Sequence, residues 1–391
     1  MTPAMLMISD TASLQAFCQD LSSAETITVD TEFMREKTYW PQLCLVQVAG
    51  PGEGTENAKA IDALAPGIDL TPLFELMANE SILKVFHAAR QDLEIFHHLS
   101  GHLPKPVFDT QVAAMVCGFG DSVGYEMLVT TLTNETVDKG SRFTDWTARP
   151  LSSRQIDYAL ADVTHLRIVH EKISKKLAAN GRESWLEQEM AILTTPRTYD
   201  SDPREVYKRI KSGNARPKTL AVLRELAAWR EDEAKRRDLP RNRVIRDEQL
   251  LEISHHPAEK PADLARIRGM GSKFAEGPAG EAIIEAVKKG LAVPDQDRPR
   301  PKRRPRIPNG TGPASQLLKV LLKMRCDEHE VAQKLLASSE DIENLAAFGD
   351  KADVPALKGW RREVFGDDAV RLLKGDIALA VKNGKTVIFE S

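Results

Sequence analysis

The chain has 391 residues, of which 42% are hydrophobic and 28% are charged, and its formal net charge is −3. These values are ordinary for a globular protein of two or three domains, and they exclude a polycation, so any nucleic-acid binding has to come from local basic clusters. The four cysteines, Cys18, Cys44, Cys117 and Cys326, lie far apart, which argues against a zinc site or a disulfide framework and favours a cytoplasmic location.

The start of the chain, MTPAMLMISD, lacks the basic segment of a signal peptide. No apolar run approaches the ~18 residues of a membrane span. We therefore expect neither a signal peptide nor a membrane segment.

The first part of the chain, to about residue 170, mixes strand and helix signals. Apolar runs rich in β-branched residues predict four strands: TITVD (26–30), LCLVQVA (43–49), KAIDAL (59–64) and ILKVFH (82–87). The last of these continues into the helical pattern AARQDLEIFHHL. Strands followed by helices predict an α/β domain with a sheet flanked by helices.

From Pro203 onward the pattern is helical. Residues 216–238 place apolar side chains at helical spacing, and the same pattern resumes after residue 313 and runs, with breaks, nearly to the end. Between them, residues 294–313 are basic and rich in proline, which predicts an extended, solvated linker. The similar elements DEQLLEIS and SSEDIENLAAF hint at a duplicated small helical domain, which the pattern alone leaves open.

Four carboxylates and one phenol suggest the chemistry. Asp30 and Glu32 share one face of the first predicted strand, where burial of two anions is costly unless a cation lies between them. Asp92 follows the fourth strand, and Tyr158 precedes Asp162 by one helical turn. Oxygen ligands of this kind select hard cations such as Mg²⁺ or Mn²⁺. Singly, each group has an ordinary explanation as a strand-edge, helix-start or helix-surface residue, but their order within one stretch favours a shared site.

The segments around these five residues carry a family resemblance. VDTEF, HAARQDLEIF and YALADVTHL resemble the three exonuclease motifs of the DEDD superfamily, and the tyrosine four residues before the last aspartate resembles its tyrosine subclass. TYWPQLCLVQVA, VFDTQVAAM and SRFTDWTARPLS resemble the ribonuclease D family. The helical pattern from residue 216 is similar to the HRDC domain.

The resemblance implies a fold and a division into domains. The implied fold is an α/β, ribonuclease-H-like (DnaQ-like) exonuclease domain with a mixed sheet flanked by helices, followed by two all-α HRDC-type domains. The implied boundaries are 1–195 for the exonuclease, 203–293 for the HRDC domain, 294–313 for the linker and 314–391 for a second, divergent HRDC-like domain.

It also implies an activity. The family members are 3′–5′ exoribonucleases that release nucleoside 5′-monophosphates hydrolytically, with two divalent metal ions (Mg²⁺ or Mn²⁺) as cofactors and tRNA precursors as the substrate class. Asp30 would bridge both ions, Glu32 and Asp162 would hold the ion with the attacking water, and Asp92 would serve the ion near the leaving 3′-oxygen. Tyr158 would orient the water. The resemblance further implies a monomer.

Six more residues are candidates for RNA binding. Thr31 and Phe33 flank the first motif, His87 and Gln91 lie near Asp92, and Arg142 and Trp146 belong to the basic, aromatic segment KGSRFTDW with Lys139. Several have a structural alternative to RNA binding. Phe33 could pack in the core, His87 could be a buried structural histidine, and residues 139–146 could form a packed loop.

The linker segment RPRPKRRPR (298–306) contains six basic residues and no acid, which favours either solvated chain or sequence-independent contact with phosphates. Two rival functions stay open. A DNA 3′–5′ exonuclease would use the same acids, and a catalytically inactive binding module would not need them.

Overall fold

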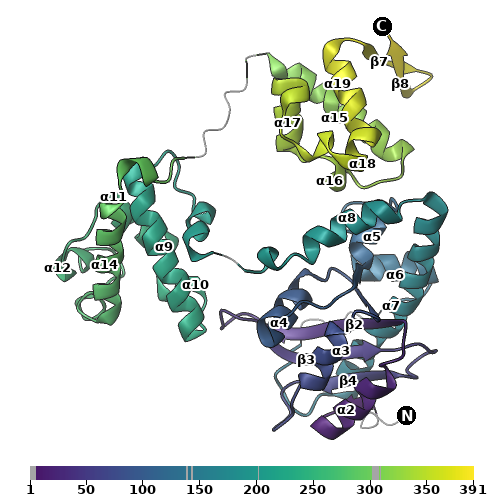
Figure 1. Cartoon of the computed structure of the whole chain (residues 1–391), viewed down its shortest axis with the longest axis horizontal. Helices are drawn as coiled ribbons and strands as arrows, with labels where there is room; N and C mark the ends of the chain where they lie inside the picture. The colour runs from purple at the N-terminus through teal and green to yellow at the C-terminus, as the bar shows by residue number, and fades with distance from the viewer. Residues whose placement is uncertain (1–5, 138–139, 142–143, 201, 302–307, 309) are drawn as a thin grey trace. The chain divides into compact units, whose positions relative to one another are not determined.

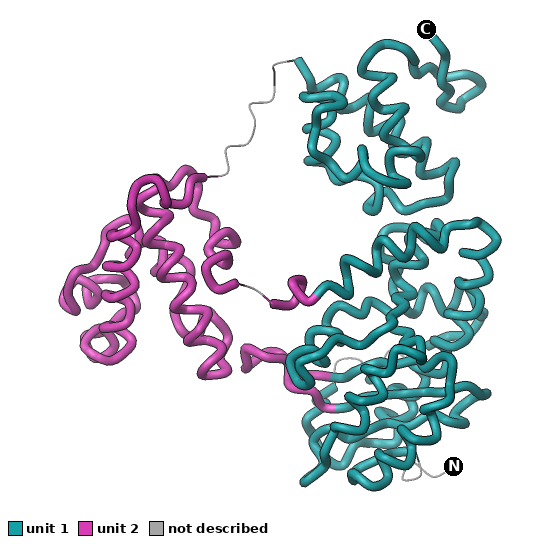
Figure 2. The backbone as a smooth tube through the Cα atoms, viewed as in Figure 1, with its two compact units in different colours: residues 1–32, 45–195, 305–391 teal, residues 33–44, 196–304 magenta. Residues whose placement is uncertain are grey.

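The computed structural model describes residues 6–137, 140–141, 144–200, 202–301, 308 and 310–391 (Figure 1). The chain forms two compact units (Figure 2). Unit 1 contains residues 1–32, 45–195 and 305–391, and unit 2 contains residues 33–44 and 196–304. Among the described residues, no helix combines the length and apolar character needed to cross a membrane.

A six-stranded mixed sheet organises the first part of the chain. Its strand order is β1-β4-β3-β2-β5-β6. The β1/β4, β2/β5 and β5/β6 pairs are parallel, and β3/β4 is antiparallel. The strands are β1 (Met7–Ile8), β2 (Thr26–Met34), β3 (Gln42–Ala49), β4 (Ala58–Asp62), β5 (Leu83–Phe86) and β6 (Val107–Asp109).

Helices pack on this sheet because its central strands are apolar on both faces. Seven consecutive residues of β3 are buried, which is typical of a strand covered on both sides. The surrounding helices are α2 (Thr11–Asp20), α3 (Thr71–Ala78), α4 (Arg90–Ser100), α5 (Thr110–Val116), α6 (Tyr125–Thr133), α7 (Ser153–Asn180) and α8 (Glu183–Leu193).

Helix α7 lies against β2. The Thr28 hydroxyl donates a hydrogen bond to the Val163 carbonyl over 2.8 Å, and it is on the same strand face as Asp30 and Glu32. A capping box of Ser152 and Gln155 fixes the start of α7. The face of β2 that carries the acids therefore meets the face of α7 that carries Asp162.

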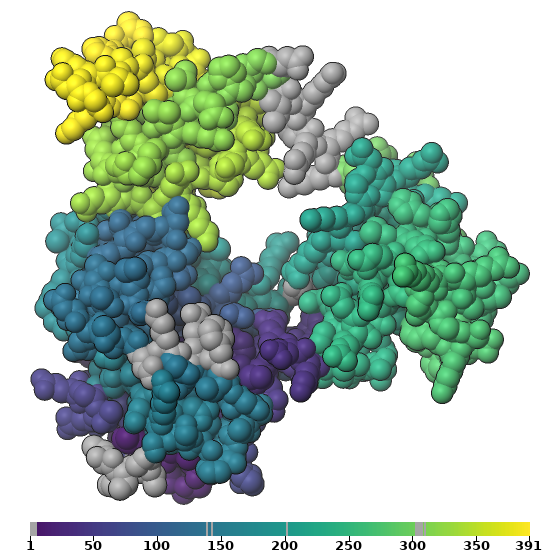
Figure 3. All heavy atoms as spheres, turned by 180° about the vertical axis from the view of Figure 1, so that it is seen from behind, coloured from purple at the N-terminus to yellow at the C-terminus, as the bar shows by residue number. Residues whose placement is uncertain are grey.

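The last part of the chain belongs to unit 1 and shares a hydrophobic core with it. Buried residues of α5 and α7, such as Ala114 and Leu166, belong to the same core cluster as Leu322 and Phe365. In Figure 3 the light-green residues of this last part lie directly against the blue residues of the first part. The elements are α15 (Thr311–Glu328), α16 (Gln333–Leu336), α17 (Ser339–Phe348), η4 (Gly349–Lys351), η5 (Pro355–Leu357), α18 (Gly359–Arg361), the π-helical η6 (Arg362–Gly366), α19 (Asp367–Lys374), β7 (Ile377–Lys382) and β8 (Lys385–Glu390).

Unit 2 is a helical bundle in which α14 packs along α9. Its core contains apolar residues of both helices, among them Leu223, Leu226 and Ile283. The elements are η2 (Pro203–Arg209), α9 (Pro217–Arg237), α10 (Arg241–Val244), α11 (Asp247–His255), α12 (Pro261–Leu264), α13 (Ser272–Ala275), α14 (Pro278–Ala292) and η3 (Asp295–Asp297), preceded by η1 (Pro196–Thr198).

The predicted fold class, a mixed sheet flanked by helices followed by helical regions, is confirmed. Three details differ from the predicted elements. Strands β1 and β6 were not predicted, α15 begins at Thr311 inside the predicted linker, and the chain ends in the hairpin β7–β8 rather than in helix. The turn of this hairpin is Asn383-Gly384, with positive φ at both residues, which is a strong hairpin signal. The exact domain boundaries stay predictions.

Candidate active site

Three of the predicted acids converge at the end of β2. Asp30 and Glu32 project from this strand, and Asp162 projects from α7. Each offers a carboxylate oxygen, and these oxygens all lie within 4.8 Å of one another. The helix that packs on β2 thus completes a cluster of anions that the strand begins.

Asp92, from a third element, lies outside this group of three but close enough to Asp30 to feel its charge. It is in the first turn of α4, is 7% exposed, and accepts a hydrogen bond from the buried Thr31 hydroxyl at its Oδ1. Burial raises the pKa of Asp92 well above its ordinary value, and the nearby charge of Asp30 raises it further. Asp30 therefore links the two parts of the site, because it lies in the group with Glu32 and Asp162 and its charge also acts on Asp92.

The charge surroundings of Asp30 and Asp92 indicate what could balance these two acids. Burial raises the pKa of Asp30 to about 6. Within the described parts of the chain, no lysine or arginine forms an ion pair with either acid. Buried carboxylates without a basic partner and with only oxygen donors fit a divalent cation such as Mg²⁺ or Mn²⁺.

Tyr158 lies one helical turn before Asp162, as predicted. Its pKa is raised far above the ordinary value, first by burial and then by the charges of Asp162, Glu32 and Asp30. The phenol is therefore protonated at neutral pH and offers an O–H group for hydrogen bonding.

A pocket of about 380 Å³ opens beside this tyrosine. Successive turns of the first half of α7 form one wall, and the segment that follows α6 forms the other. The lining residues are Thr136, Val137, Arg154, Asp157, Tyr158, Ala161 and His165. The phenol thus lines an open pocket whose walls contain both polar and apolar side chains.

Two residues that were not predicted hold backbone groups near the site by hydrogen bonds. The buried Tyr125, at the start of α6, donates a hydrogen bond from its hydroxyl to the backbone carbonyl of Asp162. Thr110, fully buried at the start of α5, donates to the carbonyl of Phe86 over 3.0 Å at the end of β5. Neither belongs to a quoted acid motif, and only the fold brings them to the site.

His87 packs between these two residues. Its Nδ1 is 3.0 Å from the Thr110 hydroxyl, and its ring centroid is 5.3 Å from that of Tyr125. Burial lowers the pKa of His87 to about 4, so the ring is neutral at pH 7. These contacts match the buried structural role that the sequence left open, and contact with RNA stays a prediction.

The other predicted RNA-binding residues lie in different surroundings. Thr31 is buried against Asp92, Phe33 is partly exposed on β2, and Gln91 is exposed on α4. Trp146 is 2% exposed, with its ring centroid 6.2 Å from that of Tyr158, so in this conformation it packs inside the domain. Arg142 and Lys139 lie outside the described residues.

Comparisons with known proteins agree with this geometry. A 3′–5′ exonuclease family matches residues 5–178, and the HRDC domain matches residues 219–287. The chain is 47% identical over 386 residues to the ribonuclease D of Nitrobacter hamburgensis, covering 99% of this chain and 100% of that protein. It is 49% identical over 382 residues to the ribonuclease D of Gluconacetobacter diazotrophicus, covering 97% and 95% of the two chains.

The chain belongs to the ribonuclease D family. Among solved structures it resembles Escherichia coli RNase D, described as an exoribonuclease involved in structured RNA processing, with a TM-score of 0.80 and 31% identity over 94% of this chain and 98% of that chain. It shares its fold with the catalytic core of RRP6 from Trypanosoma brucei, at a TM-score of 0.54 and 21% identity over 73% of this chain and 80% of that chain. As a ribonuclease D, the protein is a metal-dependent 3′–5′ exoribonuclease.

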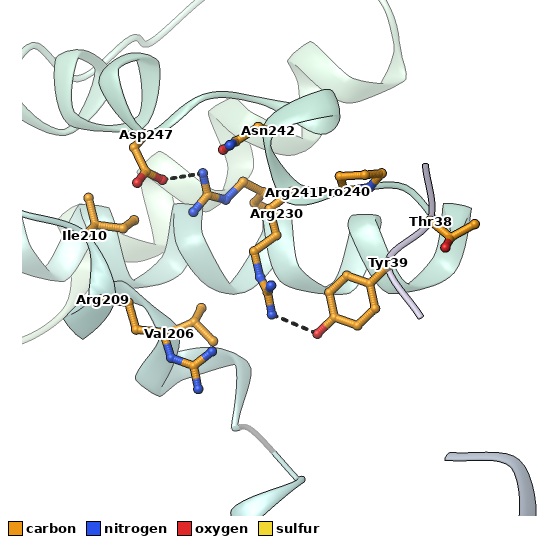
Figure 4. Close-up of a pocket in the computed structure, with 10 residues that line it drawn as sticks. All are labelled: Thr38, Tyr39, Val206, Arg209, Ile210, Arg230, Pro240, Arg241, Asn242 and Asp247. Atoms are coloured by element: carbon orange, nitrogen blue, oxygen red, sulfur yellow. Dashed lines mark hydrogen bonds and ion pairs between the residues drawn. The ribbon is translucent and has the colours of Figure 1, made fainter. Parts of the chain in front are cut away.

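A separate pocket of about 340 Å³ lies within unit 2 of this ribonuclease D (Figure 4). Its best-buried arginine, Arg230, is 5% exposed and lies 2.6 Å from Asp247. Arg241 donates to the hydroxyl of Tyr39 over 3.0 Å and pairs with Glu231. Each of these two guanidinium groups is paired with an acid of the same unit, and their contacts hold the segment around Tyr39 against α9 and α10. We therefore assign no ligand to this pocket.

Proposed function

We propose that this ribonuclease D shortens RNA from the 3′ end one nucleotide at a time by a two-metal-ion reaction, and that its substrates are tRNA precursors. The observation that carries this proposal is the convergence of four buried or half-buried acids, from β2, α4 and α7, at one end of the sheet. Such a group is stable in its ionised form only with bound cations.

Each acid has a distinct place in the proposal. Asp30, which is grouped with Glu32 and Asp162 and also acts on Asp92 by its charge, would contribute to both ions. Glu32 and Asp162 would hold one of them, and Asp92 would hold the other. When bound, the ions would polarise the phosphodiester and make the attacking water more acidic.

Tyr158 contributes through its position. Its protonated hydroxyl lies beside Asp162 and at the wall of the open pocket, so it is placed to hold and orient a water molecule by a hydrogen bond. Tyr125 and Thr31 would keep Asp162 and Asp92 in place through the contacts described above.

The substrate assignment is supported by the family and by the relative from Escherichia coli, which is described as acting in structured RNA processing. The proposal includes a monomeric protein in the cytoplasm, and the four free cysteines support that compartment.

A timed digestion of a 3′-extended tRNA tests the proposal. With Mg²⁺ or Mn²⁺ we expect products that shorten by single nucleotides toward the mature 3′ end, with release of nucleoside 5′-monophosphates, and with EDTA we expect no shortening. Matched single-stranded RNA and DNA of the same sequence belong in the same experiment. Faster degradation of DNA, or products cut internally, would contradict the assignment.

A further inference from the structure

Asp109 is a buried acid that the proposed chemistry does not use. It is the last residue of β6, is 2% exposed, and belongs to the sequence segment VFDTQVAAM. Its two carboxylate oxygens accept four backbone N–H groups: Ala88 at 3.0 Å, Ala89 at 2.8 Å, Gln111 at 2.8 Å and Val112 at 3.4 Å.

Two of these bonds cap the helix that follows Asp109 itself. Gln111 and Val112 are in the first turn of α5, so Asp109 is the N-cap residue of that helix. An asparagine or serine would serve this purpose equally well. The cap alone therefore does not explain why a full carboxylate is buried here.

The other two bonds cross to a different element. Because β5 and β6 are parallel neighbours, with Phe86 opposite Asp109, both strands end at the same edge of the sheet. The link that follows β5 turns there through Ala88, whose φ of 59° is unfavourable for a residue with a side chain, and it enters α4 after Ala89. Ala89, the N-cap residue of α4, has no side-chain cap, and the Asp109 carboxylate holds its backbone N–H from the neighbouring strand.

The link leads directly to Asp92. Asp92 is in the first turn of α4, three residues after Ala89, and the Thr31 hydroxyl holds its side chain. The carboxylate of Asp92 is thus fixed at two points. Thr31 orients the side chain, and Asp109 holds the backbone that carries it.

From this geometry we propose that Asp109 is a positioning residue of the active site, which fixes the start of α4 so that Asp92 can hold its metal ion. The inference rests on the proposed role of Asp92 as a metal ligand. Both oxygens of Asp109 face N–H donors, so Asp109→Asn would turn an amide NH₂ toward at least one of them and break the link or the cap.

Titration of the metal-free protein with Mn²⁺, followed by calorimetry, tests the proposal. For Asp109→Asn we expect the affinity of the ion held by Asp92 to fall by about 10–100-fold, the range typical for residues that orient a metal ligand. Hydrogen exchange of the metal-free variant should become faster at residues 88–93. Excess Mn²⁺ should restore most of the hydrolysis rate.

Two variants serve as references. Asp92→Asn removes the ligand itself, and Asp10→Asn changes a helix cap of the same domain, at the start of α2, that has no part in the site. Unchanged Mn²⁺ binding in Asp92→Asn would overturn the proposed function and this inference with it. Weakened binding in Asp92→Asn together with unchanged binding in Asp109→Asn would overturn the inference alone.

Should Asp109→Asn fold poorly, the double variant Asp109→Asn/Ala88→Gly relieves the positive φ of the link and keeps the test decisive. We expect it to fold and still to bind the ion of Asp92 weakly, because glycine restores the backbone conformation but supplies no hydrogen-bond acceptor. Wild-type affinity in the double variant would show that Asp109 only offsets backbone strain.

Discussion

Asp92 in unit 1 and Glu231 in unit 2 are both buried acids, with exposed fractions of 7% and 0%, but their surroundings are opposite. Burial and the charge of Asp30 raise the pKa of Asp92. Burial also opposes ionisation of Glu231, yet hydrogen bonds from Arg241 and Tyr39 and the charge of Arg241 hold its pKa below the ordinary value. Arg241 reaches both carboxylate oxygens of Glu231, at 2.5 and 2.6 Å.

The difference separates structural acids from functional ones. The charge of an acid that is buried beside an arginine is already balanced, and the pair holds parts of the chain together. Asp30 and Asp92 have no such partner among the described residues, so their ionised form depends on a cation from solution. Burial of an acid is therefore informative about function only together with its charge partners.

Asp30→Asn gives the largest expected effect. The rate of RNA hydrolysis should fall on the order of 10³-fold or more, because metal-based stabilisation of the transition state is worth several kcal/mol. RNA binding should be mostly retained. In EDTA at neutral pH, the thermal midpoint should stay the same or rise, because the variant removes a half-buried charge that has no basic partner in the part of the chain that the structure describes.

The exposed Asp20 provides the matched control, since Asp20→Asn removes the same charge at the surface of the same domain. It should change neither rate nor stability measurably. Hydrolysis at the native rate by Asp30→Asn would refute the assignment of the site. A large loss of stability in EDTA would instead show that Asp30 is a structural acid like Glu231.

Tyr158→Phe should slow hydrolysis by about 100-fold, at the lower end of the range for positioned proton-handling groups. The raised pKa of Tyr158 keeps the phenol neutral, so ionisation of this residue should produce no increase in the wild-type rate up to about pH 9. Single-turnover rates across pH measure both effects. An unchanged rate would remove the tyrosine from the mechanism without affecting the metal site.

Much of this site could be predicted from the sequence, because its residues belong to short local motifs. Asp30 and Glu32 share a strand face by their spacing, and Tyr158 and Asp162 share a helix face in the same way. The long apolar runs likewise predicted β2 to β5 within a few residues.

What the sequence could not show depends on contacts between distant segments. Tyr125 bonds to a backbone group of α7, and Asp109 bonds to backbone groups of the link before α4. The sequence around either residue gives no sign of these partners. Trp146 resembled an RNA-stacking residue because the loop around it is basic, but its burial depends on packing beside Tyr158. The strands β1 and β6 are too short, at two and three residues, to give a periodic signal.

Glu231→Gln tests the other side of the comparison. The variant leaves the Arg241 guanidinium without its acid, and we expect unit 2 to lose about 2 kcal/mol in urea unfolding. Wholly buried pairs typically lose roughly 3–5 kcal/mol, and Arg241 is partly exposed. Hydrolysis of a short unstructured RNA should change much less. Glu233→Gln, on the same helix but paired with Arg236 at the surface, should lose less than about 1 kcal/mol.

The smallest expected effect is a dependence of metal stabilisation on pH. The pKa of Asp30 is about 6 in the folded protein and 3.8 for an ordinary aspartate, so between these values the folded state binds more protons than the unfolded state. Stability of the metal-free protein should therefore fall as pH rises through this window, by about 1–2 kcal/mol after allowance for the partial exposure of Asp30. Bound Mn²⁺ should cancel that loss, so the increase in thermal midpoint on adding Mn²⁺ should be larger at pH 7 than at pH 5. Asp30→Asn should reduce this pH dependence, although Asp92, whose pKa is also raised, still contributes to it. Glu231→Gln should leave it unchanged. An equal Mn²⁺ effect at both pH values would mean that the ion does not displace a proton from Asp30.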